Sequence, residues 1–174
     1  MILNRKRFWT IGLALMTALS VMGFSLGNLI AVHAETSTYQ DPAGRFEVGI
    51  ISGYKMTPLA GMFVVESPEG DLAYTVTVRP KAGDRHLEDD QLAQIAVDTL
   101  ATGEGFIAGA FTGNDIGIEL PWRGVQGKTP IAGMVFARQT NNSVLVLSLS
   151  TTETSTEKIA EILPELSQTL KPIE

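Results

Sequence analysis

The sequence has no cysteine and only two histidines among its 174 residues. Without cysteine the chain cannot form a disulfide, a thiolate metal site, a thiol nucleophile or a lipid-modified cysteine. His33 belongs to an apolar N-terminal segment, which leaves His86 as the single histidine of the rest of the chain. The usual bases, nucleophiles and metal ligands are therefore scarce. We expect no enzymatic activity and no bound cofactor, and we assign no catalytic, cofactor-binding or metal-binding residue.

The N-terminal segment has the pattern of an export signal. Three basic residues in "MILNRKRF" precede the uncharged stretch "WTIGLALMTALSVMGFSLGNLIAV", and the small residues Val32 and Ala34 are followed at once by polar sequence. This order predicts a signal peptide over residues 1–34 with cleavage after Ala34. The alternative is an uncleaved membrane anchor, because about 20 apolar residues are enough to span a bilayer.

The charge of the remaining chain is strongly acidic. Removing residues 1–34 leaves 140 residues (174 − 34) with 10 Lys and Arg (13 − 3) against 19 Asp and Glu, so the net charge is −9 (10 − 19). A chain of this size forms one domain with a substantial core. Its acidity argues against a nucleic-acid partner and against attraction to anionic lipid. We expect membrane contact only through the N-terminal segment, if that segment is retained.

The hydrophobic pattern predicts an α+β domain. A polar, extended lead-in over residues 35–44 precedes a single domain over residues 45–174. Alternating and continuous apolar runs predict a central antiparallel sheet of about six strands, built from a hairpin and a meander. Helical spacing of apolar residues predicts two main helices that flank this sheet. The expected strands lie at 45–51, 62–66 and 72–78 and within 106–151, and the helices near 92–100 and 154–170.

A run of carboxylates beside His86 raises the question of a metal site. Glu88, Asp89 and Asp90 stand directly before the apolar periodicity of the first helix, with Asp84 as a candidate N-cap. Carboxylates in the first turn are stabilised by the helix dipole, and a metal site would need further ligands and an orienting shell that the sequence does not supply. We interpret the run as the start of a helix.

The closing helix carries two local signals. Thr154 with Glu157 three residues later has the spacing of a capping box, which predicts the N-terminus of the helix. Pro164 lies inside the same apolar periodicity and predicts a kink or a restart, because proline cannot donate to the helix ladder.

Four residues are candidates for a partner or ligand surface. Trp122 beside Arg123 is an aromatic and cationic pair of the kind favoured as interface anchors. If strand alternation turns Trp122 inward, that residue is part of the core instead. Tyr39 and Tyr54 are further candidates, because they lie in segments rich in glycine and proline.

The N-terminal part of the domain, "YQDPAGRFEV", resembles the PsbP-like family of exported proteins, which are associated with photosystem II in the thylakoid lumen. The matching residues are Tyr39, Asp41, Gly44 and Phe46, followed by a strand-rich middle and a C-terminal helix ending in "LSQTLKPI". The chain is also similar to uncharacterised exported proteins of cyanobacteria. The resemblance implies an α/β/α sandwich with helices on both sides of an antiparallel sheet.

These observations favour an exported, non-enzymatic binding or accessory protein of the thylakoid lumen or periplasm. The resemblance implies an assembly or stabilising factor of a photosynthetic membrane complex, monomeric when free, that contacts the lumenal or periplasmic face of that complex. The alternative is a small-ligand-binding domain of the periplasm or cell envelope, with a pocket near Tyr54 and Trp122. A carboxylate-based hydrolase would need two acids across a cleft. The acids considered for that role are Asp41, Glu47, Glu66 and Glu119.

Overall fold

The computed structural model describes residues 37–59, 62–101, 103 and 105–173. The expected signal peptide and its cleavage site at Ala34 lie outside the described residues. Within the described ranges, no helix combines the length and the apolar character that crossing a membrane requires.

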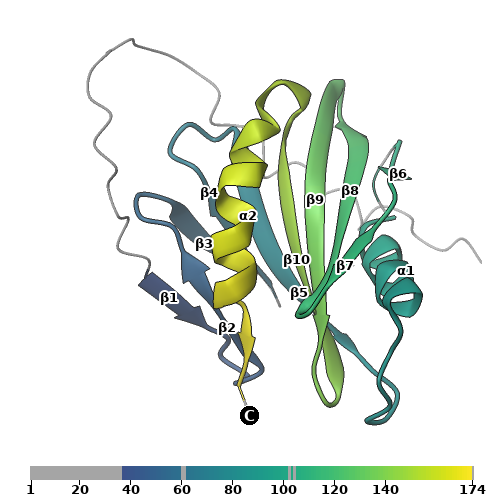
Figure 1. The fold of residues 1–174 in the computed structure, drawn as a ribbon. Helices are drawn as coiled ribbons and strands as arrows, with labels where there is room; N and C mark the ends of the chain where they lie inside the picture. The colour runs from purple at the N-terminus through teal and green to yellow at the C-terminus, as the bar shows by residue number, and fades with distance from the viewer. Residues whose placement is uncertain (1–36, 60–61, 102, 104, 174) are drawn as a thin grey trace, which may run out of the picture. The chain divides into compact units, whose positions relative to one another are not determined.

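The larger of two sheets is antiparallel and has eight strands in the order β3-β4-β5-β10-β9-β8-β6, with β7 paired to β8 (Figure 1). The expectation of about six strands in one sheet was too low, because the short strands β3, β6 and β7 were not predicted. The strand expected at 45–51 belongs to the smaller sheet instead. β10 is central, between β5 and β9. The bounds are Lys55–Leu59 (β3), Met62–Glu66 (β4), Leu72–Pro80 (β5), Ile107–Ala108 (β6), Thr112–Asn114 (β7), Gly117–Gln126 (β8), Thr129–Gln139 (β9) and Ser143–Thr152 (β10).

A second sheet of three strands has the order β1-β2-β11, with β1 over Ser37–Gln40, β2 over Phe46–Ile50 and β11 over Lys171–Pro172. β1 lies within the extended lead-in predicted from the sequence. β11 follows the last helix directly and pairs with β2, so the two ends of the domain meet in this sheet.

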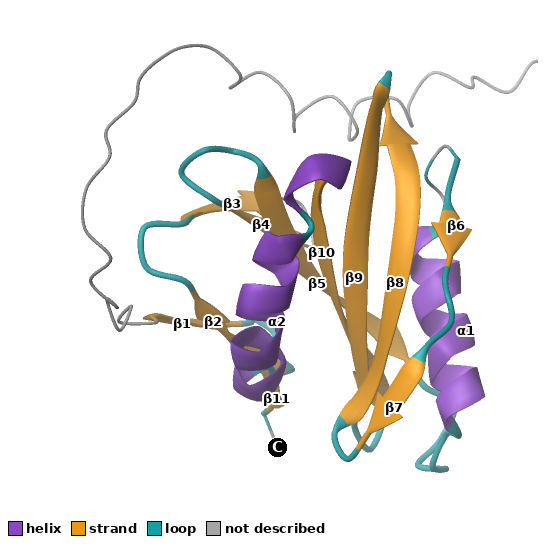
Figure 2. Ribbon diagram, turned by 45° about the horizontal axis from the view of Figure 1, so that its top comes forward, coloured by secondary structure: helices purple, strands orange, loops and turns teal. Residues whose placement is uncertain are grey.

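The two main helices, α1 (Asp89–Leu100) and α2 (Glu157–Thr169), cover opposite faces of the larger sheet (Figure 2). The side chains of β10 explain this arrangement, because they alternate between two apolar clusters. Leu145 and Leu147 pack in the cluster that contains α2, whereas Val144 and Val146 pack in the cluster that contains α1. The structure confirms an α+β fold with an antiparallel sheet between helices.

α1 begins later than the sequence suggested. Its N-cap is Glu88 rather than Asp84, and the backbone N–H of Glu88 donates to Gln91 Oε1 at 3.1 Å. His86 is exposed, and its Nε2 lies 3.3 Å from the amide nitrogen of Gln139. In the described part of the chain, no three His, Asp or Glu side chains are grouped in a way that could hold a metal ion.

α2 also differs from the prediction at its start and at its proline. A short 3-10 turn over Glu153–Ser155 precedes it, and its N-cap is Thr156 rather than Thr154. The helix continues through Pro164 without a restart. Proline has no N–H, so the carbonyl of Ala160 lacks its usual helical donor. Packing of the apolar face outweighs this loss. The buried side chains on that face are Ile159, Leu163 and Leu166.

The residues of the family resemblance lie at the turn between β1 and β2, with Tyr39 in β1 and Phe46 in β2 on either side of it. The Asp41 carboxylate accepts hydrogen bonds from Arg45 Nε at 2.6 Å and Nη2 at 2.9 Å. Gly44 has a φ of 66°, which glycine adopts without strain. Tyr39 packs against Phe63, with ring centroids 4.3 Å apart, and so joins this turn to the larger sheet.

A second, half-buried carboxylate holds the start of α2 to the hairpin between β4 and β5. Asp71 accepts hydrogen bonds from Lys158 Nζ at 2.5 Å and from Ser67 Oγ at 2.9 Å. Burial acts to raise the pKa of Asp71, but the hydrogen bonds from Lys158 and Ser67 outweigh burial and hold it below its ordinary value. The side-chain hydrogen bonds from Arg45 likewise lower the pKa of Asp41.

These two carboxylates predict a loss of stability in acid. A lowered pKa in the folded protein means that the fold favours the charged form. Its contribution is complete above the unfolded pKa of about 3.9 and disappears as the pH falls below that value, through the lower folded pKa values. We expect the double variant D41N/D71N to be less stable than wild type at pH 7 and to lose less stability on acidification. Urea unfolding at a series of pH values measures both effects.

The control for this prediction is Asp115→Asn, which removes an exposed carboxylate from the turn between β7 and β8. We expect that variant to follow the wild-type pH dependence. An equally steep acid loss in D41N/D71N and wild type would show that Asp41 and Asp71 do not cause it.

Candidate functional site

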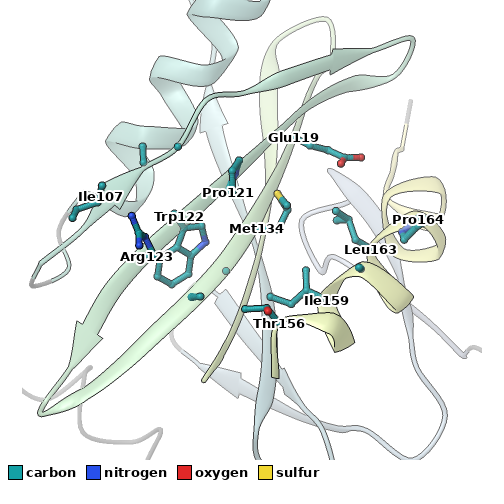
Figure 3. Close-up of a pocket in the computed structure, with 15 residues that line it drawn as sticks. Ile107, Glu119, Pro121, Trp122, Arg123, Met134, Thr156, Ile159, Leu163 and Pro164 are labelled. Carbon is teal, nitrogen blue, oxygen red and sulfur yellow. The ribbon is translucent and has the colours of Figure 1, made fainter. Parts of the chain in front are cut away.

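An apolar groove lies between α2 and β8 on the α2 face of the larger sheet (Figure 3). Its volume is about 590 Å³. We call it the α2–β8 groove. Its floor is formed by β9, through Ala132, Gly133 and Met134, and β6 lines it on the far side of β8.

Strand alternation builds the β8 wall of the groove. Glu119, Pro121 and Arg123 line the groove. The alternate residues Ile118 and Leu120 point to the opposite face and pack against α1. Ile107 of β6 pairs with Arg123 and extends the apolar surface outward, because 58% of Ile107 is exposed.

α2 forms the other wall through residues that recur at helical spacing. Ile159 and Leu163 lie one turn apart and are buried at the base of the wall. Ala160 and Pro164 also lie one turn apart, and both are exposed.

The groove is apolar along its length and charged at its two ends. Of the fifteen described residues that line it, Glu119 and Arg123 carry charge. They are four residues apart on one strand, which corresponds to roughly 13 Å. Glu119 lies on the side of Leu163 and Pro164, whereas Arg123 lies beside Ile107 (Figure 3). Among the described residues, no ion pair neutralises either side chain.

The predicted pair Trp122 and Arg123 is divided between the core and this groove. Trp122 is 9% exposed and packs in the α1 cluster, with its ring centroid 6.1 Å from that of Phe106. Its indole Nε1 is buried and has no hydrogen-bond partner among the described atoms. Arg123 is exposed, and both residues contribute to the groove lining. The inward orientation that alternation allowed for Trp122 is the one observed.

Tyr39 and Tyr54, the other two candidates, lie elsewhere. Both are half-buried against the core on the α2 face. Tyr54 lies 6.3 Å from Tyr74, measured between ring centroids, and burial raises the pKa of Tyr54. Neither tyrosine lines the α2–β8 groove. The structure thus brings Trp122 and Arg123 to the groove and places the two tyrosines apart from it.

A second, polar hollow lies beside the start of α1 and the C-terminus of α2. Arg138 lines it and donates from Nη1 to the carbonyl oxygen of Leu170 at 2.7 Å, which caps the end of α2. Burial lowers the pKa of Arg138. Charges of both signs share this hollow, including Lys81 and Asp89, so it offers no uniform field to a charged ligand. Of the four acids considered for hydrolysis, only Glu119 lines one of the two described hollows. Neither hollow therefore contains the pair of acids that a carboxylate-based hydrolase needs.

Sequence reasoning did not find most of the groove. The alternation of β8 places Glu119, Pro121 and Arg123 on one face, and this signal was available. No local sequence pattern predicts that this face of β8 lies beside Ala160 and Pro164 of α2. The groove exists because α2 lies on the same side of the sheet and leaves part of it uncovered.

Together, the antiparallel sheet, the helix on each face and the N-terminal turn define a PsbP-like α/β/α fold. No protein-family model matches the chain, and no curated protein matches it in sequence. Two solved structures share this fold. The solution structure of cyanobacterial PsbP (CyanoP) from Synechocystis sp. PCC 6803 is similar with a TM-score of 0.57 and 15% identity, covering 84% of this chain and 98% of that chain.

The crystal structure of LpqN, a protein involved in cell envelope biogenesis of Mycobacterium tuberculosis, is similar with a TM-score of 0.50 and 12% identity. The similarity covers 82% of this chain and 92% of LpqN. At these identities the comparisons establish the fold, and the function has to be argued from the groove.

Proposed function

We propose that this protein is an exported, non-enzymatic accessory factor that binds a membrane protein complex through the α2–β8 groove. The observation that carries the proposal is the groove itself, a long apolar hollow whose edge residue Ile107 is 58% exposed. Exposed apolar surface of this kind marks interaction sites. The protein is monomeric when free, and the groove is open to its partner.

The N-terminal pattern and the fold support a compartment and a kind of partner for this proposal. The signal-like residues 1–34 direct the protein to the thylakoid lumen or periplasm. One solved structure of this fold is a cyanobacterial PsbP and the other is involved in cell envelope biogenesis. The similarity to cyanobacterial PsbP supports a photosynthetic complex as the partner, contacted at its lumenal or periplasmic face.

A second candidate function is the binding of a small ligand in the same groove. Its volume of about 590 Å³ lies within the range of small-molecule sites, about 300–1,000 Å³. A ligand of this class would raise the melting temperature of the purified protein, so thermal shifts with lipids and pigments distinguish it from a macromolecular partner.

Filling the groove tests the accessory function. Ala160→Trp places a large ring in the groove from an exposed position of α2, so the fold is retained. We expect C-terminally tagged wild-type protein to recover the complex stoichiometrically from gently solubilised host membranes. Recovery by the Ala160→Trp variant should be at least tenfold lower, because interface centres tolerate little change in shape.

The matched control is Gln168→Trp, which adds the same ring to α2 at an exposed position outside the groove. We expect it to recover as much of the complex as wild type. Equal recovery by the Ala160→Trp variant would exclude the groove as the binding site. Recovery of a lone monomer by every variant would contradict the accessory function.

A further inference from the structure

We propose that the α2–β8 groove receives an amphipathic α-helix of the partner, lying beside α2 and carrying a carboxylate at one end and a cation at the other. This inference rests on the proposed function, because it names the structure that the accessory factor binds. It follows from the dimensions of the groove, its apolar lining and the charges at its two ends.

The uncovered part of the sheet has the width of one helix. α1 covers one face, over β8, β9 and β10, and on the opposite face α2 packs on β9, β10 and β2. The α2–β8 groove is the space beside α2 over β8, β6 and the part of β9 that α2 leaves free, and these strands are neighbours in the sheet. Three adjacent strands at about 4.8 Å spacing span about 10 Å, and a helix with its side chains is about 10–12 Å across. A second helix beside α2 would complete this layer.

The length of the groove corresponds to about two helical turns. From Glu119 to Arg123 the β8 wall measures roughly 13 Å. From Thr156 to Pro164 the α2 wall measures roughly 12 Å, at about 1.5 Å per helical residue. Both walls are thus long enough for about eight residues of a bound helix.

The lining fits the apolar stripe of such a helix. Pro121, Met134, Ile159 and Leu163 offer side chains along the groove, and Ile107 extends the surface at one end. An amphipathic helix buries residues at positions i, i+3, i+4 and i+7 in grooves of this type. Three or four apolar side chains of the partner helix therefore fit within the length of the groove.

The charged groups define which helix fits. Arg123 at the β6 end has no ion-pair partner among the described residues and would receive a carboxylate. At the Pro164 end, the Glu119 carboxylate would receive a lysine or arginine. On a bound helix these two charges stand about seven residues apart, because residues at that spacing share a face and lie about 10.5 Å apart.

Synthetic peptides test this assignment. Three helical peptides share one apolar stripe and carry the pairs Glu/Lys, Glu/Glu or Lys/Lys seven residues apart. Each is titrated against the wild-type protein, Arg123→Glu and Glu119→Lys, by fluorescence anisotropy at 0.15 M salt. We expect wild type to prefer Glu/Lys, Arg123→Glu to prefer Lys/Lys and Glu119→Lys to prefer Glu/Glu. Each preference should be about threefold, because an exposed ion pair contributes about 0.2–1 kcal/mol.

Three further variants separate the groove from general effects. Ala160→Trp should weaken every peptide at least tenfold, and Gln168→Trp should weaken none. Arg79→Glu makes the same change in net charge as Arg123→Glu at an exposed residue outside the groove, so it should keep the wild-type order of peptides. A wild-type order in Arg123→Glu as well would overturn the proposal.

The remaining outcomes distinguish this inference from the proposed function. If Ala160→Trp abolishes recovery of the complex but no peptide binds wild type, the accessory function stands and the helix proposal fails. A second outcome is that wild type binds dodecanoate, that Ala160→Trp does not, and that no peptide binds. This outcome would assign the groove to an amphiphile and would also overturn the helix proposal. If Ala160→Trp affects neither recovery nor peptide binding, both proposals fail.

Discussion

Replacing Gly133 by alanine is expected to lower the free energy of unfolding by about 3 kcal/mol, the upper part of the range for overpacked cores. Gly133 lies in β9 opposite Trp122 and Ser150. A Cβ atom at this position would overlap the carbonyl oxygen of Leu149 and the indole atoms Cε2 and Nε1 of Trp122. The first of these belongs to the backbone of the central strand β10, which cannot move without disturbing its hydrogen bonds on both sides.

Urea unfolding of Gly133→Ala measures this effect, and Gly103→Ala is the matched control. At Gly103 an added Cβ would lie 3.7 Å from the carbonyl oxygen of Leu100, an ordinary contact. We expect the control to change the stability by less than about 0.5 kcal/mol, as surface substitutions usually do. A Gly133→Ala variant as stable as its control would mean that β9 and Trp122 adjust more freely than the close contacts indicate.

The second large effect is expected for Leu166→Ala, which should cost about 3–4 kcal/mol. Leu166 is fully buried in α2, within the cluster that joins the helix to both sheets. Its truncation removes packing atoms and leaves a cavity under the helix, because closely packed neighbours relax only in part. α2 is also a wall of the α2–β8 groove, so the same variant should bind the partner more weakly.

Thermal and urea unfolding of Leu166→Ala, compared with Gln168→Ala, give the measurement. Gln168 is exposed two residues further along the same helix, and its replacement should be nearly neutral. A loss below about 1 kcal/mol for Leu166→Ala would show that the helix contributes little to the core, contrary to the packing that we describe.

Much of the fold was predictable because its strongest signals are local. The continuous apolar run of β10 is typical of a strand covered on both faces, and β10 is central. The strands that were missed are short and exposed. Every residue of β6 and β7 is exposed, and β3 is nearly so and contains Pro58. Such edge segments pair through their backbones and show no apolar alternation for a sequence pattern to reveal.

The helix boundaries show the same division. The apolar spacing located α1 and α2, but their first residues are Asp89 and Glu157 rather than those that the cap signals suggested. Cap signals compete within a few residues, and the packing of the helix on the sheet selects among them. Pro164 is tolerated for a related reason, because the buried face of α2 stabilises the helix more than one lost hydrogen bond weakens it.

For the groove, the sequence by itself determined the two faces of β8. Side chains of a strand alternate with a period of two, so Trp122 had to face one side and Glu119, Pro121 and Arg123 the other. Tertiary structure alone decided that this second face lies beside α2 and is left uncovered, and that Tyr54 packs against the core outside the groove. The physical reason is that the uncovered width depends on how many strands one helix spans. That number is set by the packing of segments distant in the sequence.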